Sequence, residues 1–237
     1  MCTEEKSIKM INSILRMNRL SYSIKVTNSK KVFLIGVILL CTGLDIGLYA
    51  AGDAAKGKAA YAVCTACHGA NGAGNKTLNA PSIAGQESWY VERQLKNFKA
   101  GIRGANPKDT FGMQMRPMAL TLSDNQAIAD MAAYVSSMPE NKSLENSVIG
   151  DASAGKASYM ICQTCHGPKG GGNRALNAPK LTGLQDWYIV RQIKNFKSGI
   201  RGTKSGDIYG MQMRPMAMTL SSDEAIKNVA AYIATLK

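Results

Sequence analysis

Apolar residues recur at helical spacing in three stretches between residues 52 and 138. The first, residues 53–63, leads into a glycine-rich loop, and the second, residues 88–100, carries an apolar stripe that includes Leu95 and Phe98. The third opens at Ser123 and repeats its apolar residues every three to four positions, which is the period of an amphipathic helix. Because no β-branched run reads as a parallel strand, the pattern predicts an all-α fold.

The same pattern returns 98 residues later without a gap, so that residues 52–138 align with residues 150–236. Roughly half of the aligned positions are identical, and the run from Gly112 to Ala119 recurs intact from Gly210 to Ala217. A unit of this length is longer than a solenoid repeat and is a small domain copied once. We therefore expect a leader at 1–51, a first domain at 52–138, a polar linker at 139–149 and a second domain at 150–237.

Local signals indicate how each repeat begins and closes its helices. Ser123 is expected to open the third helix, and Ser221 with Glu224 makes a fuller capping box at the matching place in the second repeat. Gly57 is small enough to let another helix approach closely. We expect the first and last helices to cross there, with Gly57 against Tyr134 and the corresponding pair 98 residues later.

Residues 1–51 differ in character from the repeats. A polar and basic stretch precedes the apolar run from Val32 to Leu40, and small residues follow near Ala50. This order is typical of a secretory signal, and Asp45 interrupts any extension of the run into a membrane span. An uncleaved anchor is the alternative, and translation from Met17 is a further hypothesis. The sequence thus predicts export to the periplasm.

The charge balance is basic throughout. The whole chain has a formal net charge of +13 from 29 basic and 16 acidic residues, and residues 1–51 hold seven and three of these, which leaves +9 for the rest. Such a surface favours an acidic docking partner or peripheral association with an anionic membrane, and simple solubility explains it equally well. Export and the scattered basic residues argue against nucleic acid as a partner.

The motif Cys-x-x-Cys-His occurs once in each repeat, and its residues are Cys64, Cys67 and His68, then Cys162, Cys165 and His166. Two thiols three residues apart on a helix can add to the two vinyl groups of one haem, which leaves the adjacent imidazole facing the iron. A thioredoxin-like site needs a βαβ context, and a zinc site needs a fourth ligand that neither motif offers. The chain's only two histidines are those of the motifs. Two covalently bound haem c groups are predicted, and no disulfide.

With no spare histidine, the candidates for the sixth iron ligand are methionine, lysine, tyrosine, the amino terminus or an open site. A thioether opposite imidazole raises the haem potential and suits electron transfer. Each repeat offers three methionines in what reads as a loop rich in glycine and proline, and these are Met113, Met115 and Met118, then Met211, Met213 and Met216. Periodicity cannot rank them.

These motifs together resemble the dihaem cytochrome c4 family, which consists of two class I cytochrome c domains in tandem. The resemblance extends from about residue 52 to the end of the chain. It rests on Gly-Asp-Ala-Ala before the first haem motif, the Pro-x-[Ile/Leu]-x-Gly stretches at 81–85 and 179–183, and Arg-Gln-[Leu/Ile]-Lys-Asn-Phe at 93–98 and 191–196. It rests further on Met-Arg-Pro-Met before Leu-Ser, and on a final Ala-Ala-Tyr.

The resemblance implies particular site residues. The iron-binding methionine is the first of the Met-x-x-Met pair, which falls on Met115 and Met213. The carbonyl groups of Pro81 and Pro179 are implied to accept a hydrogen bond from the histidine ligands. The extra upstream methionine, Met113 or Met211, leaves that ligand assignment open.

The resemblance also implies a one-electron carrier, not an enzyme. Its expected donor is a membrane quinol-oxidising complex or a dehydrogenase, and its expected acceptor is a terminal oxidase or a reductase. The similarity of the two repeats suggests closely spaced haem potentials. Two alternatives stay open: a cytochrome subunit of a dehydrogenase, and a dihaem redox enzyme with a labile axial site.

Basic side chains at a spacing of three mark one side of the second helix in each repeat. They are Arg93, Lys96 and Lys99, then Arg191, Lys194 and Lys197, with Arg103 and Arg201 in the following turn. Two interpretations stay open. The face is merely solvated, or some of its arginines pair with haem propionates or guide a docking partner.

Overall fold

The computed structural model describes residues 51–141, 144 and 146–236. The chain divides into two units, Met1–Leu48 and Tyr49–Lys237, and both repeats belong to the second unit. The expected signal segment and its cleavage region lie outside the described residues. Within the described part of the chain, no helix has the length and the apolar character needed to cross a membrane.

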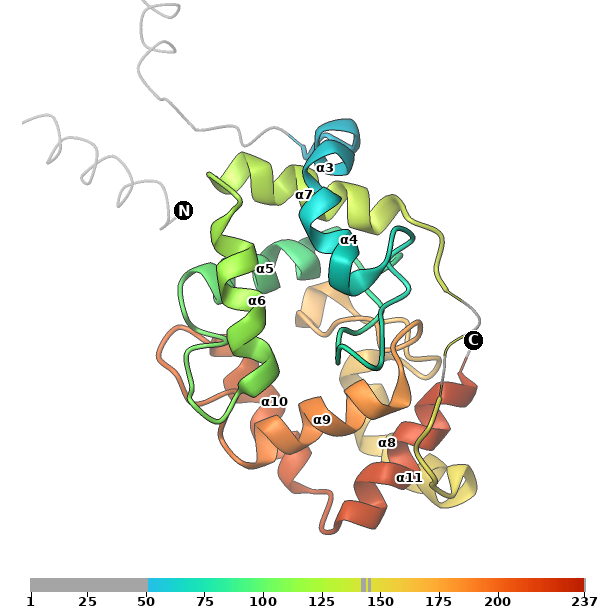
Figure 1. Ribbon diagram of the computed structural model, residues 1–237. Helices are drawn as coiled ribbons and strands as arrows, with labels where there is room; N and C mark the ends of the chain where they lie inside the picture. The colour runs from blue at the N-terminus through green and yellow to red at the C-terminus, as the bar shows by residue number, and fades with distance from the viewer. Residues whose placement is uncertain (1–50, 142–143, 145, 237) are drawn as a thin grey trace, which may run out of the picture. The chain divides into compact units, whose positions relative to one another are not determined.

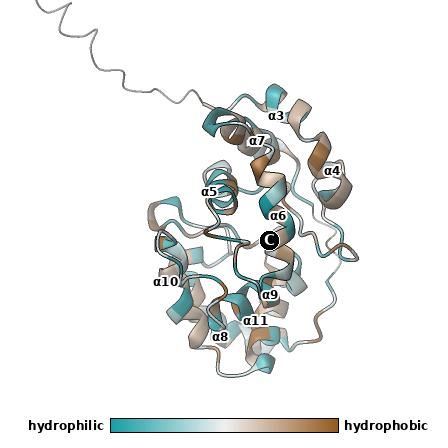
Figure 2. Ribbon diagram, turned by 60° about the vertical axis from the view of Figure 1, so that its left-hand side comes forward, coloured by the Kyte–Doolittle hydropathy of each residue, from teal (hydrophilic) through white to brown (hydrophobic). Residues whose placement is uncertain are grey.

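The described residues form helices and no β-strand, so the all-α prediction is confirmed (Figure 1). The first repeat contains α3 (Ala54–Ala60), α4 (Ala62–His68), α5 (Ser88–Lys99), α6 (Thr110–Leu120) and α7 (Asn125–Ser137). The second contains α8 (Ala152–His166), the short 3₁₀ helix η1 (Arg174–Leu176), α9 (Asp186–Lys197), α10 (Ile208–Met218) and α11 (Asp223–Thr235). Figure 2 shows hydrophobic and hydrophilic residues along the same helices, such as α7.

The first and last helices of each repeat cross where glycine was expected to permit it. A β-carbon built on Gly57 would lie 2.0 Å from the Asp130 carbonyl oxygen and 2.8 Å from the Tyr134 β-carbon. In the second repeat, a β-carbon on Gly155 would lie 1.9 Å from the Asn228 carbonyl oxygen. These distances are shorter than any normal contact, so only glycine lets the two helices approach so closely. The predicted crossing is confirmed.

The predicted starts of the last helices were wrong by one residue. In α7 the N-cap is Asp124, whose carboxylate accepts from the Ala127 backbone N–H at 2.8 Å. In α11 it is Ser222, whose hydroxyl accepts from Ala225 at 3.1 Å. In both repeats the cap oxygen accepts from the N–H of the third helical residue, and that third residue is an alanine. Neither Ser221 nor Glu224 therefore takes part in a capping box.

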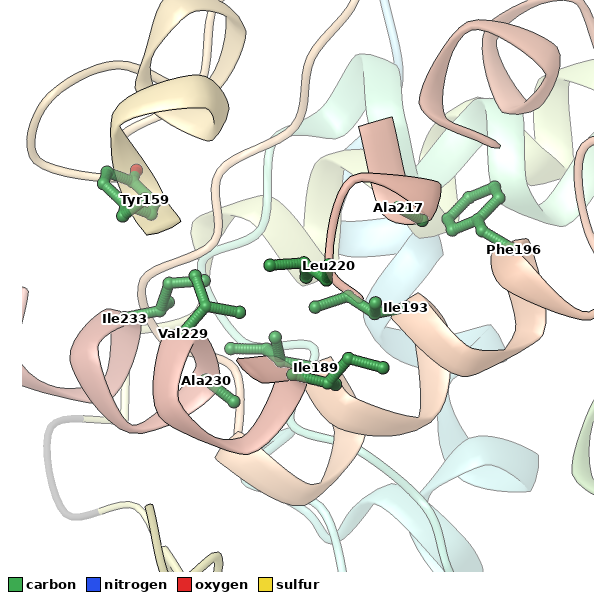
Figure 3. Packing of buried hydrophobic residues seen from close by; sticks show 10 residues of the cluster. Tyr159, Ile189, Ile193, Phe196, Ala217, Leu220, Val229, Ala230 and Ile233 are labelled. Carbon is green, nitrogen blue, oxygen red and sulfur yellow. The ribbon is translucent and has the colours of Figure 1, made fainter. Parts of the chain in front are cut away.

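The core of the second repeat lies between α9 and α11. Figure 3 shows Ile193, Leu220, Val229 and Ile233 pointing toward one another, with Ile189 beside them. The first repeat builds its core from the matching stretches, and its buried members include Ile128, Met131 and Val135, which lie at apolar positions of the helical pattern predicted after Ser123. These two small cores are what hold the walls of the sites described below.

One contact at the helix crossing differs between the repeats and predicts a difference in acid stability. The Asp130 carboxylate accepts a hydrogen bond from the Asp53 backbone N–H at 2.7 Å, and this bond holds the Asp130 pKa below its ordinary value. Asn228 makes the matching contact to Asp151 at 2.8 Å without a titrating group. Because the folded-state pKa is depressed, the Asp130 contribution to stability is present above the unfolded pKa of about 4 and is lost as the pH falls through the folded pKa.

In the Asp130→Asn protein, the thermal midpoint is accordingly expected to decrease less steeply than in the wild type as the pH is lowered below about 4. Melting curves recorded on the wild type and the variant across this acid range test the expectation. Asn228→Asp is the reciprocal variant and should steepen the same fall. Equal slopes for all three proteins would contradict the prediction.

Candidate haem sites

The two haem motifs lie at the ends of helices, with both cysteines of each motif on the same helix. Cys64 and Cys67 belong to α4 and Cys162 and Cys165 to α8, and none of the four is paired in a disulfide. Each helix ends at the histidine of its motif, and the next residue is a glycine with positive φ, 76° at Gly69. That conformation favours glycine and turns the chain away from the helix directly after the histidine. The motif therefore forms one rigid wall of a cavity.

The two histidines are buried and oriented by backbone carbonyl groups. His68 Nδ1 lies 2.8 Å from the Pro81 carbonyl oxygen, and His166 Nδ1 lies 2.8 Å from that of Pro179. Because a carbonyl can only accept, Nδ1 carries the proton and Nε2 keeps its lone pair. Burial lowers the pKa of both imidazoles and favours the neutral form that can bind a metal.

The methionines do not lie in a loop, as the sequence suggested, but in helices α6 and α10. Met115 and Met118 line the same cavity as His68, and Met213 and Met216 line the same cavity as His166. The upstream pair, Met113 and Met211, lines neither cavity, and their residues are 41% and 46% exposed. Glycine and proline misled the prediction, because α6 and α10 each contain both residue types.

Each repeat encloses a cavity with a mostly apolar lining. The first cavity, beside His68, encloses about 1380 Å³ and the second, beside His166, about 1290 Å³, in both cases including space open to solvent. The thiols and the imidazole of each motif contribute to the lining, and two methionines contribute from another helix. This set of donors fits a covalently attached haem with an imidazole and a thioether as the available axial ligands.

The cavities also share residues across the two repeats. Tyr90 and Gln94 of α5 and Tyr188 and Gln192 of α9 line both cavities. Our sequence reasoning missed all four. The available signal was their identity between the two repeats, which an apolar-periodicity argument does not use.

The basic face of α5 and α9 is not simply a solvated face, because its arginines join the two repeats. Arg93 donates to the Asn177 side chain at 3.1 Å and to the Asn177 carbonyl oxygen at 2.9 Å. Arg191 makes the reciprocal pair of contacts with Asn79. Each arginine therefore binds the loop that precedes the proline of the other repeat. Spacing along one helix could not reveal this partner, because the partner lies in the other repeat.

Arg103 and Arg201 are buried where the repeats meet. Arg103 donates to Gln94 at 2.7 Å and to Gln192 at 3.3 Å, and Arg201 makes the same contacts in reverse order. The Nε atom of each arginine is buried without a hydrogen-bond partner, and each arginine lines the cavity of its own repeat. A haem propionate is an acceptor of the required charge, so these orphaned donors also fit the predicted cofactor.

A family model described as Cytochrome c matches the chain twice, at residues 54–139 and 152–237. A cytochrome c4 from Azotobacter vinelandii is 34% identical over 207 residues, which cover 83% of this chain and 95% of the relative. The chain belongs to the cytochrome c4 family. Two tandem cytochrome c domains with their Cys-x-x-Cys-His motifs indicate two covalently bound haem c groups, and this family member is a dihaem electron carrier.

Solved structures agree with this assignment. The crystal structure of reduced recombinant cytochrome c4 from Pseudomonas stutzeri matches with a TM-score of 0.63 and 33% identity, covering 79% of this chain and all of that one. A relative from Stutzerimonas stutzeri, described as a thiosulfate dehydrogenase electron acceptor, is 31% identical over 186 residues and covers 73% of this chain and 78% of the relative. The resemblance stated from sequence is thereby confirmed at the level of the family and the fold.

Proposed function

We propose that the chain is an exported carrier of single electrons between redox proteins, with His68 and Met115 as the axial ligands of one haem iron and His166 and Met213 as those of the other. The observation that carries the proposal is that each histidine and its methionine line one cavity, from two different helices. The bound haem supplies an iron that changes between the ferrous and ferric states, and the chain's side chains govern its ligation and access.

The choice of Met115 and Met213 within each Met-x-x-Met pair is supported by burial. Both are partly buried, whereas Met118 and Met216 are 40% and 41% exposed. Met213 packs against the core of the second repeat. A sulfur held by the core keeps a fixed position more readily than one that reaches solvent. On the histidine side, the carbonyl groups of Pro81 and Pro179 would fix the orientation of the imidazole and raise its basicity as a ligand.

The shared lining supports electron exchange between the two haems. Tyr90, Gln94, Tyr188 and Gln192 each border both cavities, so the two cofactors would be separated by a single layer of side chains. Most positions that line one cavity correspond to positions that line the other, 98 residues away, and the haem motif and the methionine pair are the same in both, so we propose closely spaced potentials. The pair then acts as a two-electron store that is filled and emptied one electron at a time.

The partners we propose are a quinol-oxidising complex or a dehydrogenase as donor, and a terminal oxidase or reductase as acceptor, in the periplasm. A dehydrogenase donor is favoured by the relatives described as thiosulfate dehydrogenase electron acceptors. The basic surface supports an acidic docking face on the partner and peripheral association with the membrane. Reduction by a purified thiosulfate dehydrogenase at a rate that falls with added salt is the outcome that supports this donor.

An anaerobic redox titration of the haem-loaded protein tests the carrier function. We expect two overlapping one-electron steps, and a reduced spectrum that does not change when carbon monoxide is added. The reason is that a bound thioether leaves no open position on either iron. Binding of the gas to either haem in the unaltered protein would instead favour a redox enzyme with a labile axial site. Two widely separated reduction steps would refute the proposal of closely spaced haem potentials.

A further inference from the structure

The helices that carry the methionines have little stability of their own. α6 contains Gly112 and Pro117, and α10 contains Gly210 and Pro215. Proline lacks the N–H that would bond to the carbonyl four residues earlier, which is that of Met113 or Met211. Glycine adds a conformational-entropy cost. Each helix must therefore be held in place by contacts with the rest of its repeat.

The first end of each helix is fixed by an aspartate from the same segment. Asp109 accepts from the Gly112 backbone N–H at 3.1 Å, and Asp207 accepts from that of Gly210 at 3.1 Å. Both caps are buried. These caps fix the N-terminal ends of α6 and α10. They do not fix the C-terminal ends, beyond Pro117 and Pro215.

The far end is held by a lysine from a different helix. Lys99, the last residue of α5, donates from its Nζ to the carbonyl oxygen of Leu122 and, at 3.0 Å, to that of Ser123. Lys197, the last residue of α9, donates to the carbonyl oxygen of Leu220. These carbonyl groups follow the C-terminal ends of α6 and α10, where the helix dipole is negative and a cation is favourable.

The position one turn earlier on α5 behaves differently. Lys96 forms a surface ion pair with Glu92 at 2.5 Å, four residues earlier on the same helix, and its side chain is 42% exposed. This ion pair lies within α5, whereas the bond of Lys99 joins α5 to the segment after α6. The bond to the segment past the methionine helix recurs at Lys197, the equivalent position of the second repeat.

We propose that Lys99 and Lys197 are positioning residues that hold the methionine helices against the haem cavities and so keep the axial thioethers bound. This inference rests on the proposed function, since it takes Met115 and Met213 as the ligands. Neither lysine lines a haem cavity. Each acts by tying the end of α5 or α9 to the segment just past its methionine helix, and without that tie the sulfur leaves the iron more often.

The test is a titration of the ferric, haem-loaded protein with free imidazole, which competes with the methionine for the iron. The readout is the weak far-red absorption band that reports an iron–thioether bond. Lys99→Met keeps the aliphatic stem and removes the donor. We expect one of the two haems to lose the band at an imidazole concentration about tenfold lower than in the wild type, which corresponds to the loss of one charge-assisted hydrogen bond. Lys96→Met is the matched control and should titrate like the wild type.

Further variants separate the possible outcomes. Lys99→Arg keeps a charged donor and should restore the wild-type titration, and Lys197→Met should weaken the other haem alone. An unchanged titration in a folded Lys99→Met protein overturns the inference, as does a Lys99→Arg protein that titrates like Lys99→Met. If Lys99→Met does not load its haem, Lys197→Met is titrated in its place and the same criteria apply. Absence of the far-red band from the wild type would instead overturn the methionine ligation itself.

Discussion

Replacing Cys64 and Cys67 by alanine is expected to leave the chain with one haem instead of two. Among the residues that the structure describes, the two thiols of the first motif are the only cysteines that line the first cavity, so no other described residue there can form the thioether bonds. Intact-mass measurement should show the loss of one haem, and the absorbance of the alkaline pyridine complex should fall by about half, because one of two haem groups is absent.

The stability of the first repeat should fall together with its haem. A covalently attached group that fills a large apolar cavity contributes buried contacts in the folded state, and its loss should cost more than the roughly 3–5 kcal/mol that truncation of one buried large aromatic side chain costs. We expect the thermal unfolding of the variant to begin earlier and to broaden. The matched control is Cys162→Ala with Cys165→Ala, which should leave the first repeat loaded. Retention of two covalent haems in either double variant would contradict the assignment of these cysteines.

The sequence predicted the parts of the fold that depend on local pattern. The duplication, the helix of residues 88–100 and the apolar stripe through Ile128 and Val135 all follow from spacing alone, and the structure contains them. The crossing at Gly57 was predictable because a glycine inside a helical pattern often marks the place where another helix packs closely. Where the last helix began was harder, since Ser123 and Asp124 are both good caps and only the backbone geometry selects between them.

What the sequence could not reveal depends on contacts between the repeats. Arg93 reads as part of a solvated face until the loop at Asn177 is placed against it, and that loop lies 84 residues away. The buried Arg103 likewise donates to Gln94 and Gln192, from both repeats. Periodicity reports which face of a helix is apolar, and it carries no information about which polar face meets a second domain.

The methionine helix was missed for a different reason. Gly112 and Pro117 both disfavour a helix interior, so propensity predicted a loop. The structure supplies contacts that outweigh this preference: the local cap by Asp109, and the tertiary packing of the buried Ala119 and the lysine at the far end. A helix that depends on such contacts can hold a methionine at its centre in position, and loss of one of those contacts would let that methionine move away from the cavity.

Met115→Ala is expected to open the first haem iron to external ligands. Alanine cannot reach the iron, and the chain's only other histidine, His166, lies in the motif of the second repeat. The reduced variant should bind about one carbon monoxide per chain, and the far-red ferric band should lose about half of its intensity, because one of two iron–thioether bonds is gone. Loss of the thioether should also lower the potential of that haem.

Two neighbouring variants make this result specific. Met113→Ala removes a side chain that lines neither cavity and should leave both haems closed to the gas. Met118→Ala removes a side chain at the cavity that we do not take as the ligand, and it should also leave both haems closed. If Met118→Ala opens the iron and Met115→Ala does not, the second methionine of the pair is the ligand. Met115 and Met118 lie on α6 within one turn of each other. That outcome would therefore move the ligand by three residues along the helix, and the site would still pair a histidine with a methionine.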